Sequence, residues 1–194
     1  MKRLTAAALL LLLIVACKKA DAPPAETAAA PPAPGTPAWK VLNARSAAPA
    51  QISMNATVVD GVITDSVPGA TLAPGENGWT CWADNPATNN EDPICVDEQG
   101  LVFVRAWISR QPPRLTGMGV AYTLKGGSPT ASDTDPYKAA PDSGQPWTQE
   151  PPQIGIVMPS ARSYTGLPTR RRPDGPWVRF AGTPYAYIVV PSGP

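Results

Sequence analysis

The sequence predicts an α+β fold: a mainly antiparallel β-sheet, one main helix near residues 93–109 and one disulfide, in one domain. Three observations predict it. The chain has 26 Pro and 16 Gly and is only 16% charged, a composition that favours turns and short strands over long helices. Several short runs alternate between apolar and polar residues and are rich in β-branched side chains. A single longer stretch has helical periodicity.

Residues 1–16 are expected to be a lipoprotein signal peptide. Lys2 and Arg3 precede a short apolar run that ends in Ile14-Val15-Ala16-Cys17, which fits a bacterial lipobox. Cys17 is therefore the expected lipidation site, and an N-terminal diacylglyceryl cysteine would hold the protein on the membrane, on the periplasmic side. Cys17 is followed by Lys18 rather than Asp, which slightly favours the outer membrane over the inner one.

Residues 17–37 follow as the lipidated cysteine and a Pro/Ala-rich tether. Such a composition buries little apolar surface and favours an extended, semi-rigid chain. The single globular domain is expected over residues 38–194, with its ordered part beginning nearer Gln51 because residues 43–50 are small and polar.

A β-hairpin is expected next. Asp60-Gly61 is a strong two-residue turn signal, and it separates strands expected near residues 52–59 and 62–66.

The main helix is expected to begin with Asp92 as its N-cap and Pro93 as its first residue, and to stop before Pro112. The alternative is a strand over residues 101–108. Cys81 and Cys95 remain as an even pair in an oxidising compartment, which predicts a structural disulfide. It would close a loop of about 15 residues and contribute about 3 kcal/mol. With the helix in this place, the disulfide would join its first turn to a strand at residues 79–82.

Further strands are expected at residues 118–125, 153–158, 177–180 and 186–190. The intervening segment 128–149 is polar and rich in turn residues.

Five short segments resemble a family of uncharacterised exported bacterial proteins, many of them lipoproteins. The segments are Gly78-Trp79-Thr80-Cys81, Asp92-Pro93-Ile94-Cys95, Leu124-Lys125-Gly126-Gly127-Ser128, Asp133-Thr134-Asp135-Pro136-Tyr137 and Gly182-Thr183-Pro184-Tyr185-Ala186. The resemblance implies no activity, but it implies a helix-like segment after Cys95.

Composition excludes several classes of site. The chain has no histidine, which removes a Ser-His-Asp triad, a Cys-His dyad and His-ligated zinc or haem. A net charge of +1 gives no case for nucleic acid as a partner.

The loop at residues 132–135 is the best candidate for chemistry. Asp133 and Asp135 are spaced so that their carboxylates could hold Ca²⁺ through oxygen ligands. The alternative is that both residues cap turns and that a short helix starts at Pro136, with no cofactor bound.

Two other groups are candidates for binding or catalysis. Arg170, Arg171 and Arg172 could contact anionic groups, and Trp147 is the tryptophan expected to be exposed. Asp84 with Glu91 and Asp92 could supply the carboxylate pair of a glycan hydrolase.

These observations lead us to expect a lipid-anchored cell-envelope protein that acts as a non-enzymatic binding or structural module, with an envelope protein or glycan as its partner. The alternative is a carboxylate-dependent hydrolase acting on an envelope glycan.

Overall fold

The computed structural model describes residues 30–63 and 69–193. The predicted signal peptide, Cys17 and most of the tether lie outside these residues. Residues Pro31–Pro194 form one compact unit, distinct from the chain before it.

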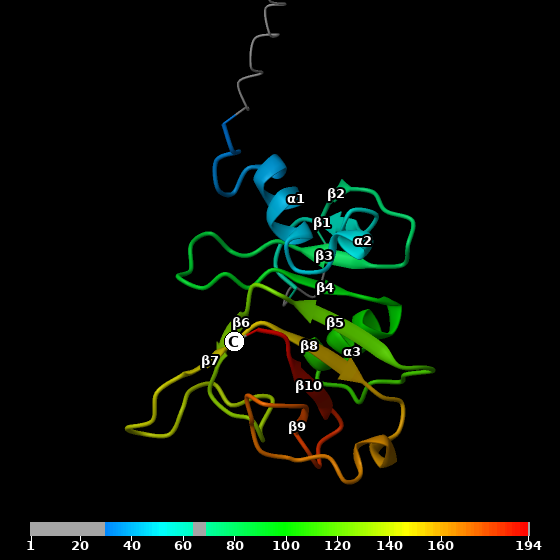
Figure 1. Cartoon of the computed structure of the whole chain (residues 1–194), viewed down its shortest axis with the longest axis vertical. Helices are drawn as coiled ribbons and strands as arrows, with labels where there is room; N and C mark the ends of the chain where they lie inside the picture. Colours follow the sequence, from blue (N-terminus) through cyan, green and yellow to red (C-terminus); the bar gives the residue numbers. More distant parts are fainter. Residues whose placement is uncertain (1–29, 64–68, 194) are drawn as a thin grey trace, which may run out of the picture. The chain divides into compact units, whose positions relative to one another are not determined.

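An α+β fold is confirmed, with a large sheet in which antiparallel pairs dominate. Among the described residues, eight strands form the main sheet in the order β2-β1-β3-β4-β5-β8-β10-β9 (Figure 1). Every pair in it is antiparallel except β1 with β3. These strands are β1 (Thr57–Val59), β2 (Thr71–Ala73), β3 (Thr80–Trp82), β4 (Ile94–Val96), β5 (Gly119–Thr123), β8 (Gln153–Val157), β9 (Trp177–Arg179) and β10 (Tyr187–Pro191).

A second, two-stranded sheet pairs β6 (Gly127–Thr130) with β7 (Thr148–Glu150). The sequence predicted turns, and no strands, for the polar segment 128–149. The strands predicted near residues 118–125, 153–158, 177–180 and 186–190 are present as β5, β8, β9 and β10.

The helices are α1 (Pro37–Arg45), α2 (Ala50–Ser53), α3 (Glu98–Ile108) and the 3₁₀ turn η1 (Ala161–Tyr164). Helix α1 was not predicted, and ordered structure begins well before Gln51. The N-terminus of α1 has the usual local signals. The Thr36 side chain accepts a hydrogen bond from the Trp39 amide, and Pro37 is in the first turn.

The main helix is present, so the alternative strand over residues 101–108 is wrong, but the helix begins later than predicted. Its N-cap is Asp97, whose carboxylate accepts a hydrogen bond from the Gly100 amide at 2.7 Å. Residues 94–96 are extended because β4 pairs with β3 on one side and with β5 on the other. Pairing with strands distant in sequence thus outweighs the local helix-start signal at Asp92-Pro93.

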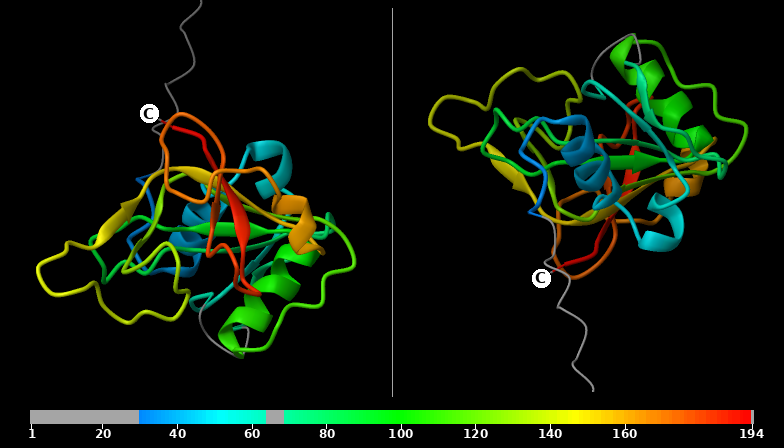
Figure 2. Two further views of the ribbon diagram at one scale, coloured as in Figure 1. Left: turned by 90° about the horizontal axis from the view of Figure 1, so that it is seen from below. Right: turned by 90° about the horizontal axis from the view of Figure 1, so that it is seen from above.

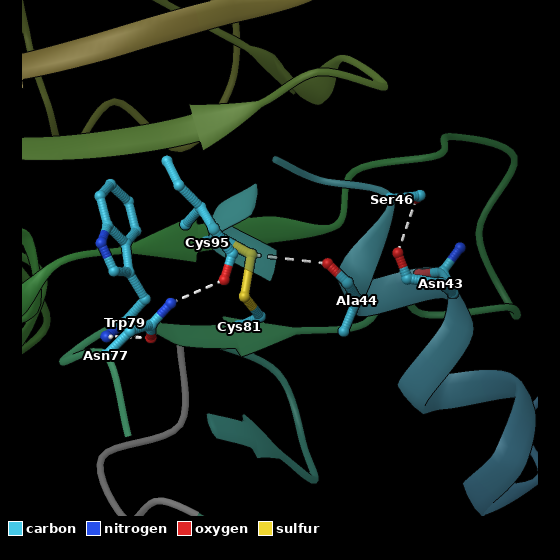
Figure 3. Close-up of a disulfide and its surroundings, with 8 residues drawn as sticks. Asn43, Ala44, Ser46, Asn77, Trp79, Cys81 and Cys95 are labelled. Carbon is cyan, nitrogen blue, oxygen red and sulfur yellow. Dashed lines mark hydrogen bonds between the residues drawn. A yellow bond between two sulfur atoms is a disulfide. The ribbon is translucent and has the colours of Figure 1, made fainter. Parts of the chain in front are cut away.

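The Cys81–Cys95 disulfide is confirmed, but it joins two neighbouring strands rather than a strand and a helix. The two cysteines face each other in the β3–β4 register, with their Cα atoms 4.0 Å apart. Both are fully buried, and Cys95 Sγ lies 3.6 Å from the Ala44 carbonyl oxygen of α1 (Figure 3). The disulfide therefore lies in the layer between α1 and the sheet.

The predicted hairpin, with strands near residues 52–59 and 62–66 joined at Asp60-Gly61, is wrong. Residues 50–53 are helical, and β1 pairs with β2, which begins only at Thr71. Residues 64–66 of the expected second strand lie outside the described residues.

Two core clusters form because successive strand residues point to opposite faces of the sheet. Val58, Cys81 and Cys95 pack with Ala44 of α1 in one cluster. In the other cluster their neighbours Val59, Trp82 and Val96 pack with Phe103 and Val104 of α3. Figure 2 shows α3 as a layer along one side of the sheet.

Candidate functional site

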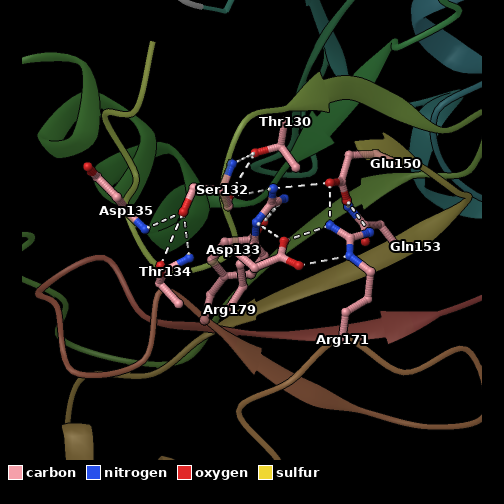
Figure 4. A network of polar contacts seen from close by, with 10 residues as sticks. Thr130, Ser132, Asp133, Thr134, Asp135, Glu150, Gln153, Arg171 and Arg179 are labelled. Atoms are coloured by element: carbon pink, nitrogen blue, oxygen red, sulfur yellow. Dashed lines mark hydrogen bonds and ion pairs between the residues drawn. The ribbon is translucent and has the colours of Figure 1, made fainter. Parts of the chain in front are cut away.

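Asp133 and Arg171, two of the residues singled out from the sequence, meet in an ion-pair network (Figure 4). Arg171 binds Asp133 through two hydrogen bonds, Nε to Oδ2 at 2.9 Å and Nη2 to Oδ1 at 2.7 Å. Its Nη2 also lies 2.6 Å from Glu150 Oε1. Arg179 completes the network, with Nη2 at 3.0 Å from Glu150 and Nε at 3.3 Å from Asp133.

The network is mostly withdrawn from water and balanced in charge. Glu150 is 3% exposed and Arg179 is 5% exposed. Burial lowers the pKa of Arg171, but hydrogen bonds and charge from Asp133 and Glu150 outweigh burial and raise that pKa. Two guanidinium groups thus face two carboxylates, and these contacts tie β7, β9 and the loops at Asp133 and Arg171 together.

Asp135 makes a different contact. Its carboxylate accepts a hydrogen bond from the Tyr137 amide at 2.9 Å, which is the turn-capping arrangement. Pro136 and Tyr137 form a turn rather than a short helix. Within residues 30–63 and 69–193, no group of three or more His, Cys, Asp or Glu side chains is placed to hold a metal ion.

The remaining predicted binding residues lie on the surface. Arg172 pairs with Asp174 at 2.8 Å; the Arg172 side chain is partly exposed and the Asp174 side chain is largely exposed. Arg170 is exposed, and Trp147 is 53% exposed, as expected. Only Arg171 of the three arginines enters the ion-pair network.

A carboxyl pair forms from Asp84 and Asp92, whereas Glu91 lies 3.9 Å from Lys125. Asp84 is 9% exposed and accepts a hydrogen bond from the Asp92 amide. Burial, together with the neighbouring Asp92 carboxyl, raises the pKa of Asp84 to about 6. Asp92 also contacts the Ser128 hydroxyl.

An apolar cavity of about 100 Å³ lies between α3 and the sheet; we call it the α3 cavity. Small residues leave this space open: Ala121 and Gly155 face each other in the β5–β8 register. The residues that line it are Ile94, Gly100, Phe103, Val104, Trp107, Val120, Ala121, Thr123, Gln153, Gly155, Val157 and Tyr187.

A second hollow, of about 300 Å³, runs beside the C-terminal half of α3; we call it the α3 groove. Its walls are Ile63, Ile94, Val104, Trp107, Ile108, Arg110 and Tyr137. It shares Ile94, Val104 and Trp107 with the α3 cavity, so the same side chains border both spaces. We refer to the cavity and the groove together as the α3 cleft.

Arg110 and Tyr137 are the polar side chains in the wall of the α3 groove. The Arg110 guanidinium carbon lies 4.6 Å from the centre of the Tyr137 ring, within cation–π range. The Tyr137 hydroxyl donates a hydrogen bond to the Trp107 carbonyl at 2.8 Å, which fixes the ring against α3. Burial raises the pKa of Tyr137, so its hydroxyl stays protonated at neutral pH.

Sequence reasoning missed the α3 cleft. The aromatic and aliphatic periodicity of residues 101–108 indicated a core-facing helix, and nothing in it distinguishes a filled interface from one that leaves space. Tyr137 belongs to the Asp133-Thr134-Asp135-Pro136-Tyr137 segment, but that segment does not indicate its contact with Arg110, which depends on the fold.

Within the described residues, no helix is long and apolar enough to cross a lipid bilayer. Comparisons with protein-family models, curated proteins and solved structures gave no match to this chain. Its proposed function therefore depends on its own residues and geometry.

Proposed function

We propose that this protein is a lipid-anchored, non-enzymatic binding module of the bacterial cell envelope, and that it binds an apolar ligand in the α3 cleft. Cys17 carries the lipid, the Pro/Ala-rich tether holds the domain away from the membrane, and the domain faces the periplasm, with the outer membrane favoured.

The observation that carries the binding role is the α3 cleft. An apolar cavity of about 150 Å³ in another protein stays dry and takes up small hydrophobic molecules. Ligand sites combine a largely apolar lining with a few polar groups that fix orientation. The α3 cleft has this character, because aliphatic and aromatic side chains form most of its walls and Arg110 lies in the wall of the groove.

Catalysis is less well supported than binding. The chain contains no histidine. The carboxylates of Asp133 and Glu150 are committed to Arg171 and Arg179. The ion-pair network therefore serves the proposed module by holding its loops in place.

Ligand binding is tested with the mature chain (residues 17–194) carrying Cys17→Ser, so that no lipid interferes. The neutral dye N-phenyl-1-naphthylamine becomes fluorescent in apolar sites and is the probe. Ala121→Leu places a larger side chain in the α3 cavity and should reduce dye binding at least tenfold, whereas Ala87→Leu on an exposed loop should leave it unchanged. Equal binding by both variants, with unchanged circular dichroism spectra, would overturn the proposal.

The anchor has its own test in the bacterium. Cys17→Ser in the full chain should abolish labelling by an alkyne fatty acid and prevent anchoring through the N-terminal cysteine. Labelling that persists in this variant would contradict a lipid on Cys17. Fractionation of the labelled wild-type protein by membrane density then separates outer from inner membrane.

A second candidate function rests on the Asp84–Asp92 pair. The raised pKa of Asp84 suits a general acid, which is one of the two carboxyl roles in a glycan hydrolase. Release of soluble fragments from purified peptidoglycan, lost in Asp84→Asn but kept in Asp142→Asn on an exposed loop, would support this function. No release by the wild-type protein would count against it.

A further inference from the structure

Arg110 has a backbone conformation that favours glycine. It follows α3 with φ at 56°, in the left-handed region. Its amide donates to the Trp107 carbonyl, and the Gln111 amide donates to the Ala106 carbonyl. These two bonds form the Schellman motif that ends many helices, in which the residue at the Arg110 position is usually glycine.

Helix termination alone does not explain an arginine at position 110, because glycine would end the helix without its conformational cost. A side chain in this conformation has a local conformational cost that glycine does not have. Such costs persist where a side chain is needed in a particular place. The left-handed turn at Arg110 places its guanidinium over the Tyr137 ring in the wall of the α3 groove.

Among the described residues, no carboxylate forms an ion pair with this guanidinium. Arg105 on the same helix also has no ion pair among residues 30–63 and 69–193, but Arg110 differs from it because it lines the α3 groove. Its described partner is the face of the Tyr137 ring, which leaves the N–H groups available to an anion. The mainly apolar wall of the groove thus includes one cation.

We propose that the α3 cleft binds a fatty-acid anion, with its acyl chain along α3 between Ile94, Val104 and Trp107 and its carboxylate on Arg110. The proposal rests on the proposed binding function and adds the class of ligand. A guanidinium binds a carboxylate through paired hydrogen bonds, and apolar walls favour the hydrocarbon chain. The Tyr137 ring holds the guanidinium in place, so less side-chain freedom is lost on binding.

The test compares three amphiphiles with the same chain: decanoate, decanol and decyltrimethylammonium. Each is titrated below its micellar concentration into the mature Cys17→Ser chain by calorimetry at pH 7.5 and low salt. Decanoate should bind about fivefold more tightly than decanol, the difference expected for one solvent-accessible ion pair, and the cation should bind most weakly.

Arg110→Gln should remove the preference for decanoate, so that the variant binds decanoate and decanol with equal affinity. Arg105→Gln is the matched control, because Arg105 is exposed on the same helix and does not line the groove. Equal affinities for decanoate and decanol in the wild type, or a preference that survives Arg110→Gln, would overturn the fatty-acid proposal while leaving apolar binding intact. Failure of all three amphiphiles to bind would overturn both the fatty-acid proposal and the proposed binding function.

Discussion

Arg110 links the stability of the helix end to the proposed binding site. Because glycine adopts the left-handed conformation without the cost that arginine has, Arg110→Gly should raise the free energy of unfolding by about 1 kcal/mol. The same change removes the guanidinium and should lower decanoate affinity. Urea denaturation of the mature chain measures the first effect and calorimetry the second. A variant that is less stable than wild type would show that the cation–π contact with Tyr137 outweighs the backbone cost.

Asp84 gives the protein a specific dependence of stability on pH. Its pKa in the folded state is raised to about 6 by burial and by Asp92, above its value in the unfolded chain. Protonated Asp84 therefore contributes stability that is fully present below the unfolded pKa and is lost as the pH rises through about 6.

The Asp84→Asn variant isolates this contribution. Between pH 4 and pH 7 the wild type should lose about 1 to 2 kcal/mol more unfolding free energy than Asp84→Asn. Urea denaturation at a series of pH values measures both proteins. Parallel pH curves for the two would contradict the raised pKa.

At the scale of elements, the ion-pair network joins the short strands β7 and β9 to their flanking loops. Glu150→Ala removes one of the two carboxylates that pair with the buried Arg179 and leaves only Asp133. This change should lower the free energy of unfolding by about 3 kcal/mol. Asp174→Ala breaks the exposed pair with Arg172 and should change little. Thermal and urea denaturation compare the two, and equal effects would show that burial does not matter here.

Some elements were predictable because their signals are local. Strands β5, β8 and β10 have alternating or β-branched runs, and α3 has helical periodicity closed by Pro112-Pro113. By contrast, Asp92-Pro93 fits both a helix start and the entry to a strand. Pairing of β4 with β3 and β5 decides between them, and the residues next to Asp92-Pro93 give no signal of that pairing.

The candidate site was predicted only in part, for a similar reason. Asp133 and Arg171 each stood out as charged loop residues, but their bidentate contact depends on how distant loops come together. The calcium hypothesis for Asp133 and Asp135 stays untested, although Asp133 already binds two arginines and Asp135 caps a turn. The placement of Arg110 over Tyr137 likewise has no signal in the sequence near either residue.

For the molecule as a whole, the sheet separates two apolar surfaces. The α3 cleft lies on one face, and strand alternation places Ile154, Ile156 and Ile188 on the other. Those three side chains are partly exposed, and they offer a competing place for an apolar ligand to bind. We assign binding to the first face, because its groove combines apolar walls with the Arg110 guanidinium.

The most direct measurement is a methyl NMR titration of the mature Cys17→Ser chain with decanoate, using labelled Ile and Val side chains. We predict saturable shifts at Ile94, Val104 and Ile108, with little change at Ile154, Ile156 and Ile188. Shifts confined to the second set, or no shifts at millimolar decanoate, would contradict a ligand site in the α3 cleft.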